Sequence, residues 1–146
     1  MGWGGVFSLG QGDITKAYAD VRNNSRVLVF KLGSNAELPG SAVYQENIVA
    51  PPEQTATPEQ IAPGKTLFNQ YCAACHGVRA IGGGLIQDIR YGGALHSPEL
   101  WNQVVLDGLF ATKGMAGFSS VLNQQQAAQI RAYVIDVAQE DVQLKK

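Results

Sequence analysis

Two cysteines and an adjacent histidine are the residues of this sequence whose types and spacing point most directly to chemistry. They occur in the segment Cys72-Ala73-Ala74-Cys75-His76, a C-x-x-C-H motif. This motif is typical of covalent attachment of a c-type haem. The two cysteines lie almost one helical turn apart, so both sulfurs can reach the same porphyrin edge and add to its vinyl groups. His76 can then bind the iron as the proximal ligand.

Three other interpretations of the motif are weaker. A thioredoxin-like dithiol would stand beside a βαβ pattern, which this sequence lacks. A zinc site could use Cys72, Cys75, His76 and His96, but the adjacent pair Cys75 and His76 is awkward for one tetrahedral centre. A disulfide across so short a loop would be strained. We therefore favour haem.

The second axial ligand of an electron-transfer haem has three candidates, Met115, His96 and Met1. Met115 is favoured because glycines flank it in a loop that can lay its thioether over the distal face; otherwise it is a core filler. His96 would give bis-histidine ligation, and otherwise lies at the surface before a helix. Methionine–histidine ligation raises the reduction potential and leaves no iron site open for oxygen.

The composition is that of one globular domain with a core of its own: 146 residues, 45% hydrophobic and 16% charged. A net charge of -1 gives no indication of a nucleic acid or an anionic membrane surface as partner. No apolar run approaches the roughly 18 residues of a membrane span. No secretory leader is visible, although covalent haem is normally inserted outside the bacterial cytoplasm. We therefore expect that a leader was removed or that the chain is part of a longer protein.

The elements that must position these residues follow from local patterns. Residues 26–32 predict a strand, which needs a sheet to join and finds little else in the chain to pair with. Five of the six prolines fall in residues 39–63, which predicts an extended linker or tether over 39–62. Helices are expected from Pro63 to Tyr71, from Pro98 towards Gly108 with Ser97 as N-cap, and from Gln124 to about Gln139 with Asn123 as cap.

This order of helix, haem motif, glycine loop, methionine loop and C-terminal helix resembles the class I cytochrome c fold. In that family a small residue and an aromatic on the first helix cross an aromatic on the last, roles that Gly64, Phe68 and Tyr133 match. The resemblance implies an all-α domain around one covalent haem at 63–146. It would be preceded by a short β or irregular segment at 1–38 and the proline-rich linker at 39–62.

A closer resemblance is to the cytochrome domain of quinohaemoprotein alcohol dehydrogenases. It rests on Gly83-Gly84-Leu85, Asp88-Ile89-Arg90-Tyr91, Leu100-Trp101, Val104-Val105-Leu106-Asp107-Gly108, Gly114-Met115, Phe118 and Ile130-Arg131-Ala132-Tyr133-Val134. The start of the chain, with Gly2-Trp3-Gly4-Gly5-Val6-Phe7 and Arg26 to Gly33, is similar to the end of that family's propeller. The family's eight-bladed β-propeller holds pyrroloquinoline quinone (PQQ) and calcium, and it would lie outside these residues.

The resemblance implies a function and further site residues. The domain would accept electrons from reduced PQQ and pass them to a soluble acceptor, a cytochrome or a copper protein, in the bacterial periplasm. Arg90 and Trp101 would hydrogen-bond or pair with a haem propionate; otherwise they are a surface arginine and a core tryptophan. Gln87 departs from the family's proline, whose carbonyl accepts from the proximal histidine, and Ala116 departs from a proline after the methionine.

Two other functions stay open at this point. A free-standing electron-carrier cytochrome would need only the residues from about 55 onwards. A haem sensor or peroxidase would need an iron site that Met115 leaves open. Whether this chain is part of an enzyme is not decided by its own residues, because none of them need bind an alcohol.

Overall fold

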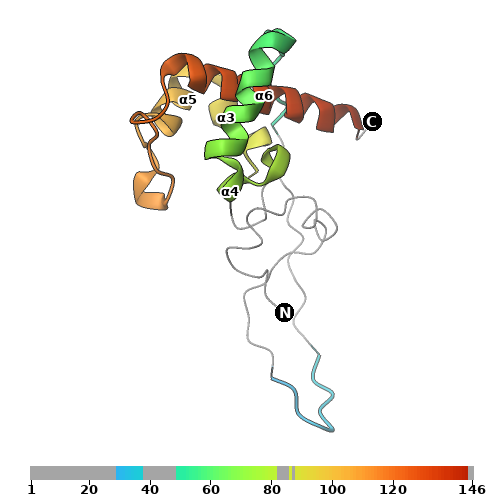
Figure 1. Ribbon diagram of the computed structural model, residues 1–146. Coiled ribbons are helices and arrows are strands. Elements are labelled where there is room, and N and C mark those ends of the chain that lie inside the picture. Colours follow the sequence, from blue (N-terminus) through green and yellow to red (C-terminus); the bar gives the residue numbers. More distant parts are fainter. Residues whose placement is uncertain (1–28, 38–48, 82–85, 87, 145–146) are drawn as a thin grey trace.

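The computed structural model of the protein describes residues 29–37, 49–81, 86 and 88–144. Within these ranges every regular element is a helix, as the all-α class predicts (Figure 1). The predicted strand is not formed over 29–32, where Val29, Phe30 and Leu32 are exposed; residues 26–28 lie outside the described ranges. The physical reason is that a strand needs a neighbour to pair its backbone groups, and the described residues offer none.

Helix α3 spans Pro58–Tyr71. The sequence-based start at Pro63 is therefore wrong, because Pro58 occupies the first turn and Thr57 caps the helix. The Thr57 backbone N–H donates to Gln60 Oε1 at 3.0 Å, which is half of a capping box. Pro63 lies inside the helix and removes one of its backbone hydrogen bonds. The packing of Gly64 and Phe68, both buried, offsets that loss.

Helix α6 spans Gln124–Leu144 and extends beyond the predicted end at Gln139. The Asn123 side-chain oxygen accepts from the Gln126 backbone N–H, and Gln126 Oε1 accepts in return from the Asn123 N–H, both at 2.9 Å. These reciprocal bonds satisfy two donors at the start of the helix, so Asn123 is the cap that the sequence predicts.

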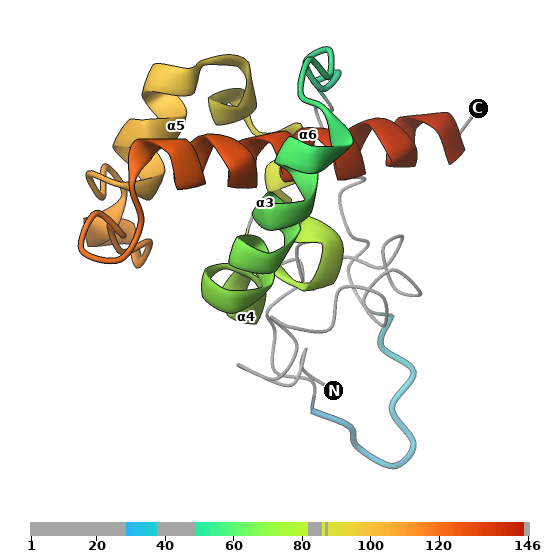
Figure 2. The same cartoon turned by 45° about the horizontal axis from the view of Figure 1, so that its top comes forward.

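Helices α3 and α6 cross in direct contact, and both ribbon views show the crossing (Figures 1 and 2). Gly64 makes the close approach possible, since a Cβ on it would lie 2.0 Å from the Gln129 carbonyl oxygen. The Phe68 and Tyr133 rings pack beside this point with centroids 5.4 Å apart. The three residues thus take the positions at the crossing that the resemblance implies.

Helix α5 spans Pro98–Val105, and the Ser97 hydroxyl accepts from the Leu100 N–H at 3.1 Å, as the N-cap prediction requires. Short 3-10 turns complete the domain: η1 Val78–Ala80, η2 Ile89–Tyr91, η3 Gly93–His96 and η4 Ala111–Lys113. The core side chains that are most fully buried are Phe68, Leu95, Ile130 and Val134.

The described end of the predicted linker packs against α6. Gln54 Nε2 donates to the Ala132 carbonyl at 2.8 Å, and Gln139 Nε2 donates to the Pro52 carbonyl at 2.7 Å. These bonds join positions far apart in the sequence. Residues 52–54 therefore form part of the helical domain's surface.

Candidate haem site

A cavity of about 800 Å³ lies between the end of α3, Ile86 and the segment 89–94, helix α5 and the loop that carries Met115. This volume is in the upper part of the range for ligand pockets. The lining is mainly apolar, with few polar groups at its wall. It consists of Phe68, Tyr71, Cys72, Cys75, His76, Ile86, Ile89, Gly92, Gly93, Ala94, Leu100, Trp101, Val104, Val105, Phe110, Lys113, Gly114, Met115, Ala116, Phe118 and Ile130.

The C-x-x-C-H motif forms one wall of this cavity. Cys72 ends α3 and precedes the short helix α4, Ala73–His76, which contains Cys75 and His76. Gly77 ends α4 with a φ of 76°, a left-handed value that favours glycine. Both thiols are free, with Cys72 half-buried and Cys75 exposed. Burial, with a smaller contribution from Cys75, raises the pKa of the Cys72 thiol to about 11.

The disulfide and zinc alternatives find no support among the described residues, where both thiols are free. Among the residues that the structure describes, no three His, Cys, Asp or Glu side chains gather as a metal site would require. His96, the fourth ligand of the zinc alternative, is exposed and does not line the cavity.

His76 lies on the cavity wall with a partly buried, neutral imidazole, as an iron ligand requires. Its Nδ1 atom is buried and has no hydrogen-bond partner among the described residues. Burial lowers the pKa of His76, against a smaller raising effect from Asp88, so the imidazole is neutral at pH 7 and able to bind iron. Residue 87, whose carbonyl would be the family's acceptor for the proximal histidine, lies outside the described ranges.

Met115 lines the same cavity as His76. Its loop is held by backbone contacts with the end of α5: the Phe118 N–H donates to the Val105 carbonyl at 2.8 Å. Gly117 fits closely there, because a Cβ on it would lie 2.7 Å from the Leu106 carbonyl oxygen. Of the other candidate ligands, His96 lies outside the lining, and Met1 lies outside the described residues.

Arg90 and Trp101 each have a partner within the protein. Trp101 lines the cavity, but its indole N–H donates to the Ala127 carbonyl at 2.9 Å and ties α5 to α6. Arg90 does not line the cavity, and its buried guanidinium pairs with Asp88 and Asp141. The proposed contacts of both residues with a propionate stay predictions, and each would compete with the contact seen here.

Sequence reasoning missed the acidic partners of Arg90. Asp88 lies two residues away and a local pattern could have indicated it, but Asp141 is on the last turns of α6. Tyr91 also donates its hydroxyl to Asp141, across a sequence separation of 50 residues. No periodic or motif signal links positions so far apart.

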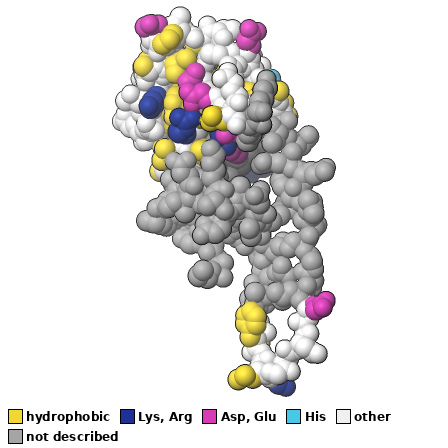
Figure 3. Space-filling model, turned by 90° about the vertical axis from the view of Figure 1, so that its right-hand side faces the viewer, with side chains coloured by type: hydrophobic (Ala, Val, Ile, Leu, Met, Phe, Trp, Pro, Cys, Tyr) yellow, Lys and Arg dark blue, Asp and Glu magenta, His cyan; other side chains and the backbone are white. Residues whose placement is uncertain are grey.

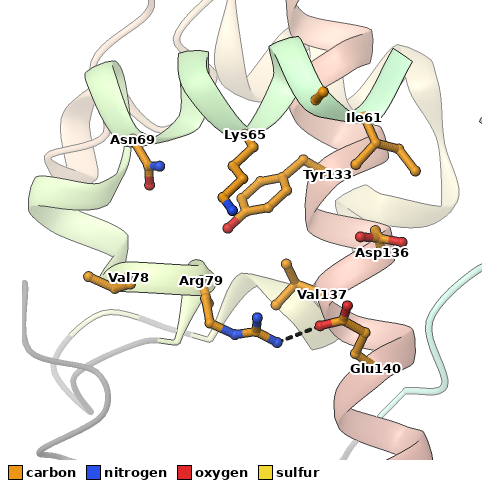
Figure 4. A pocket seen from close by; sticks show the side chains of 10 residues that line it. Ile61, Lys65, Asn69, Val78, Arg79, Tyr133, Asp136, Val137 and Glu140 are labelled. Atoms are coloured by element: carbon orange, nitrogen blue, oxygen red, sulfur yellow. Dashed lines mark hydrogen bonds and ion pairs between the residues drawn. The ribbon is translucent and has the colours of Figure 1, made fainter. Parts of the chain in front are cut away.

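A second, smaller cavity of about 330 Å³ lies between α3 and α6 (Figure 4). Lys65 and Tyr133 face it, and an ion pair between Arg79 and Glu140 at 2.5 Å borders it. Both partners of this pair are about half exposed, so the pair adds little to stability. Basic, acidic and apolar side chains are mixed on the face of the helical domain that Figure 3 shows.

The free thiols, the imidazole of His76 and the methionine on one apolar cavity fit a covalently attached haem. None of the helices in the described part of the chain combines the length and hydropathy that a bilayer crossing requires.

Comparison with known proteins agrees with this site. A family model described as cytochrome c oxidase, cbb3-type, subunit III matches residues 59–134, more than half of the chain. The quinohemoprotein alcohol dehydrogenase ADH IIB of Pseudomonas putida is 38% identical over 141 residues, which cover 96% of this chain and 20% of that protein. The 1-butanol dehydrogenase (cytochrome c) of Thauera butanivorans is 34% identical over 140 residues, covering 94% of this chain and 19% of the relative.

A solved structure extends the likeness to three dimensions. The quinohemoprotein alcohol dehydrogenase ADHIIG of Pseudomonas putida HK5 matches with a TM-score of 0.79 and 30% sequence identity, covering 97% of this chain and 20% of that one. The chain thus spans about a fifth of the length of the relatives that it matches.

Proposed function

We propose that this chain, which belongs to the cytochrome c family described as cbb3-type cytochrome c oxidase subunit III, transfers single electrons through a covalent haem with histidine–methionine ligation. The chain is also homologous to the C-terminal part of quinohaemoprotein alcohol dehydrogenases. The observation that carries this proposal is the common cavity. The two cysteines, His76 and Met115 all line it, although they come from segments about forty residues apart.

Each residue of the site has a distinct task in this function. Cys72 and Cys75 would hold the porphyrin through thioether bonds, and His76 and Met115 would fill the two axial positions. When bound, the haem supplies a reversible one-electron couple between ferric and ferrous iron. The apolar lining excludes water and lowers the local dielectric constant, and the soft thioether of Met115 favours the ferrous state. Two filled axial positions disfavour oxygen binding and peroxide chemistry.

The partners follow from the relatives. We propose that this domain accepts electrons from the reduced PQQ of an alcohol dehydrogenase propeller, on the same chain or on another subunit, with calcium in that propeller. It then passes them to a periplasmic cytochrome or copper protein. The names of the relatives, among them quinohemoprotein alcohol dehydrogenase and 1-butanol dehydrogenase (cytochrome c), support this proposal. In this arrangement the chain contributes the electron exit and need not bind the alcohol.

The axial ligation is tested by Met115→Ala, with His96→Ala as the control. Loss of the thioether opens the sixth coordination position, so we expect rapid carbon monoxide binding to the ferrous variant and a lower reduction potential. The wild type and His96→Ala should bind carbon monoxide slowly, because their position is filled. Spectrophotometry of the reduced proteins measures both rates. Rapid binding by the wild type would contradict methionine ligation and favour a sensor or peroxidase.

The link to a propeller is tested by a haem-stained denaturing gel of the protein from its native source. We expect a stained band several times heavier than the 15.6 kDa of this sequence. A band near 15.6 kDa would mean a separate cytochrome or subunit, and the fusion with a propeller would be excluded.

A further inference from the structure

Two glutamine side chains fasten the stretch before α3 onto α6. Gln54 Nε2 donates to the Ala132 carbonyl at 2.8 Å, and Gln139 Nε2 donates to the Pro52 carbonyl at 2.7 Å. One side chain reaches from the stretch to the helix and the other reaches back from the helix to the stretch, and both bonds are partly buried. We call this pair of hydrogen bonds, with residues 52–54, the α6 clamp.

The clamp sets the direction of the chain as well as its position. Ala132 and Gln139 lie about two turns apart on α6, which is roughly 10 Å along the helix axis. Pro52 meets the later of these positions and Gln54 the earlier one, so the chain runs antiparallel to α6 before it enters α3 (Figure 1). Because the two attachment points are separated along the helix, the stretch cannot pivot about either of them.

The backbone around the clamp is stiff enough to pass this direction on. Pro51 and Pro52 each have a φ fixed by the proline ring, and both are half-buried. Gln54 Oε1 accepts from the Ala56 N–H at 3.0 Å, so both ends of the Gln54 amide have a partner. Ala56 directly precedes Thr57, the cap of α3. A restrained path therefore leads from the clamp into the helix that precedes the haem motif.

We propose that Gln54 and Gln139 are positioning residues for electron entry: by fixing the stretch on α6, they hold the haem domain in the orientation that accepts electrons from PQQ. The proposal rests on the function proposed above, with the propeller on the same chain. The chain between the two domains then acts as a tether, and how often haem meets PQQ depends on the tether's free length and direction. With the clamp formed, the tether ends at Pro52; without it, the tether lengthens towards Thr57 and its direction is lost.

The test breaks the two bonds one at a time in the haem-loaded protein that includes the propeller. Gln54→Glu and Gln139→Glu each replace the donating amide by a carboxylate of nearly the same size. Gln143→Glu places the same charge at an exposed position of α6 and is the matched control. We expect haem reduction by a primary alcohol, 1-butanol first, to slow several-fold in each clamp variant and further in the double variant. Stopped-flow absorbance measures the rate, which Gln143→Glu should leave unchanged.

Further measurements separate positioning from a general loss of structure. Haem reduction by dithionite and the reduction potential should keep their wild-type values in the clamp variants, because a small reductant reaches the haem without the tether. Amide hydrogen exchange over residues 53–57 should become faster in both clamp variants and stay unchanged in Gln143→Glu. Gln139→Lys keeps a donor on a long side chain, so it should retain the wild-type rate of reduction by the alcohol.

Several results would overturn the proposal. One is an unchanged or faster rate with the alcohol in a double variant whose amides exchange faster. Another is an equal slowing of dithionite reduction, and a third is unchanged hydrogen exchange, which would show that these bonds do not hold the stretch. If the double variant does not fold, the single variants decide by the same criteria. The proposed function fails in a different way: no primary alcohol reduces the wild-type haem, while hydrogen exchange still reports on the clamp.

Discussion

At the scale of single residues, the haem motif combines two thiols in different environments. Cys72 is half-buried with its thiol pKa raised to about 11 by burial, whereas Cys75 is exposed. Both line the cavity, on the same wall as His76. Neither thiol has a protein partner that would hold it as a disulfide or a metal ligand among the described residues. Free thiols at this wall fit the covalent attachment of haem proposed above.

Removal of the thiols one at a time tests this attachment. We expect Cys72→Ala and Cys75→Ala to keep haem through denaturation, because each retains one thioether bond, and the double variant to lose it. The absorption bands of each single variant should shift to longer wavelength, since one vinyl group stays conjugated. Haem-stained denaturing gels and spectra of the reduced proteins measure both effects. Ala74→Ser, an exposed substitution between the cysteines, is the control; haem staining in the double variant would contradict the assignment.

At the scale of elements, two close backbone approaches hold the site together. The crossing of α3 and α6 depends on Gly64, and the loop of Met115 packs against the end of α5 at Gly117. In both places a side chain would meet backbone atoms, which cannot move aside as the end of a flexible side chain can. Glycine is therefore required for contact rather than for an unusual φ at these positions.

Gly64→Ala should destabilise the protein strongly. The new Cβ would lie 2.0 Å from the Gln129 carbonyl oxygen, so the helices must move apart. We expect a loss of about 3 kcal/mol in the free energy of unfolding, at the upper end of typical overpacking costs. Denaturant titration of the haem-loaded protein measures it. Gln70→Ala on the exposed part of α3 should change stability by less than about 0.5 kcal/mol. Equal stability of the two variants would mean that the crossing is not the constraint.

Gly117→Ala should act on ligation more than on stability. A Cβ there would lie 2.7 Å from the Leu106 carbonyl oxygen and 3.0 Å from the Gly108 nitrogen, which displaces the loop that presents Met115. We expect carbon monoxide to bind the ferrous variant roughly tenfold faster than the wild type, which corresponds to about 1.4 kcal/mol of lost ligand positioning. The exposed Ser120→Ala change in the same loop should leave this rate unaltered. An unchanged rate in Gly117→Ala would show that the loop has another support.

At the scale of the whole molecule, the fold is arranged around space that the protein does not fill. The cavity of about 800 Å³ has a mainly apolar lining, and contact of apolar surface with water is unfavourable. A haem bound there would cover this lining and complete the small core around Phe68, Leu95, Ile130 and Val134.

The chain without haem should consequently be largely unfolded. We expect the double variant Cys72→Ala/Cys75→Ala, purified without cofactor, to lose most of its helical circular dichroism and its cooperative thermal transition. The haem-loaded wild type should keep both. Added free haem should restore part of the helix content, since His76 and Met115 remain. A stable, fully helical apoprotein would show that the helices hold together without haem.

Much of this protein was determined by local sequence. The haem motif, the all-α class and the caps Ser97 and Asn123 depend on neighbouring residues, because their chemistry is carried within a few positions. The prediction that α3 starts at Pro63 is wrong. The helix starts at Pro58 after the cap Thr57, although this capping signal is also local. The strand predicted over 26–32 is absent from 29–32, because strand formation depends on a partner and not on propensity alone.

Tertiary structure alone decided which distant residues meet. It brought Met115 to the cavity of His76 and left His96 exposed outside it, a choice between ligands that spacing leaves open. It also joined Arg90 to Asp141 at the other end of the domain, where sequence resemblance had implied a propionate partner for that arginine. A buried charge pairs with whichever opposite charge the packing brings within reach, and packing is a property of the folded chain.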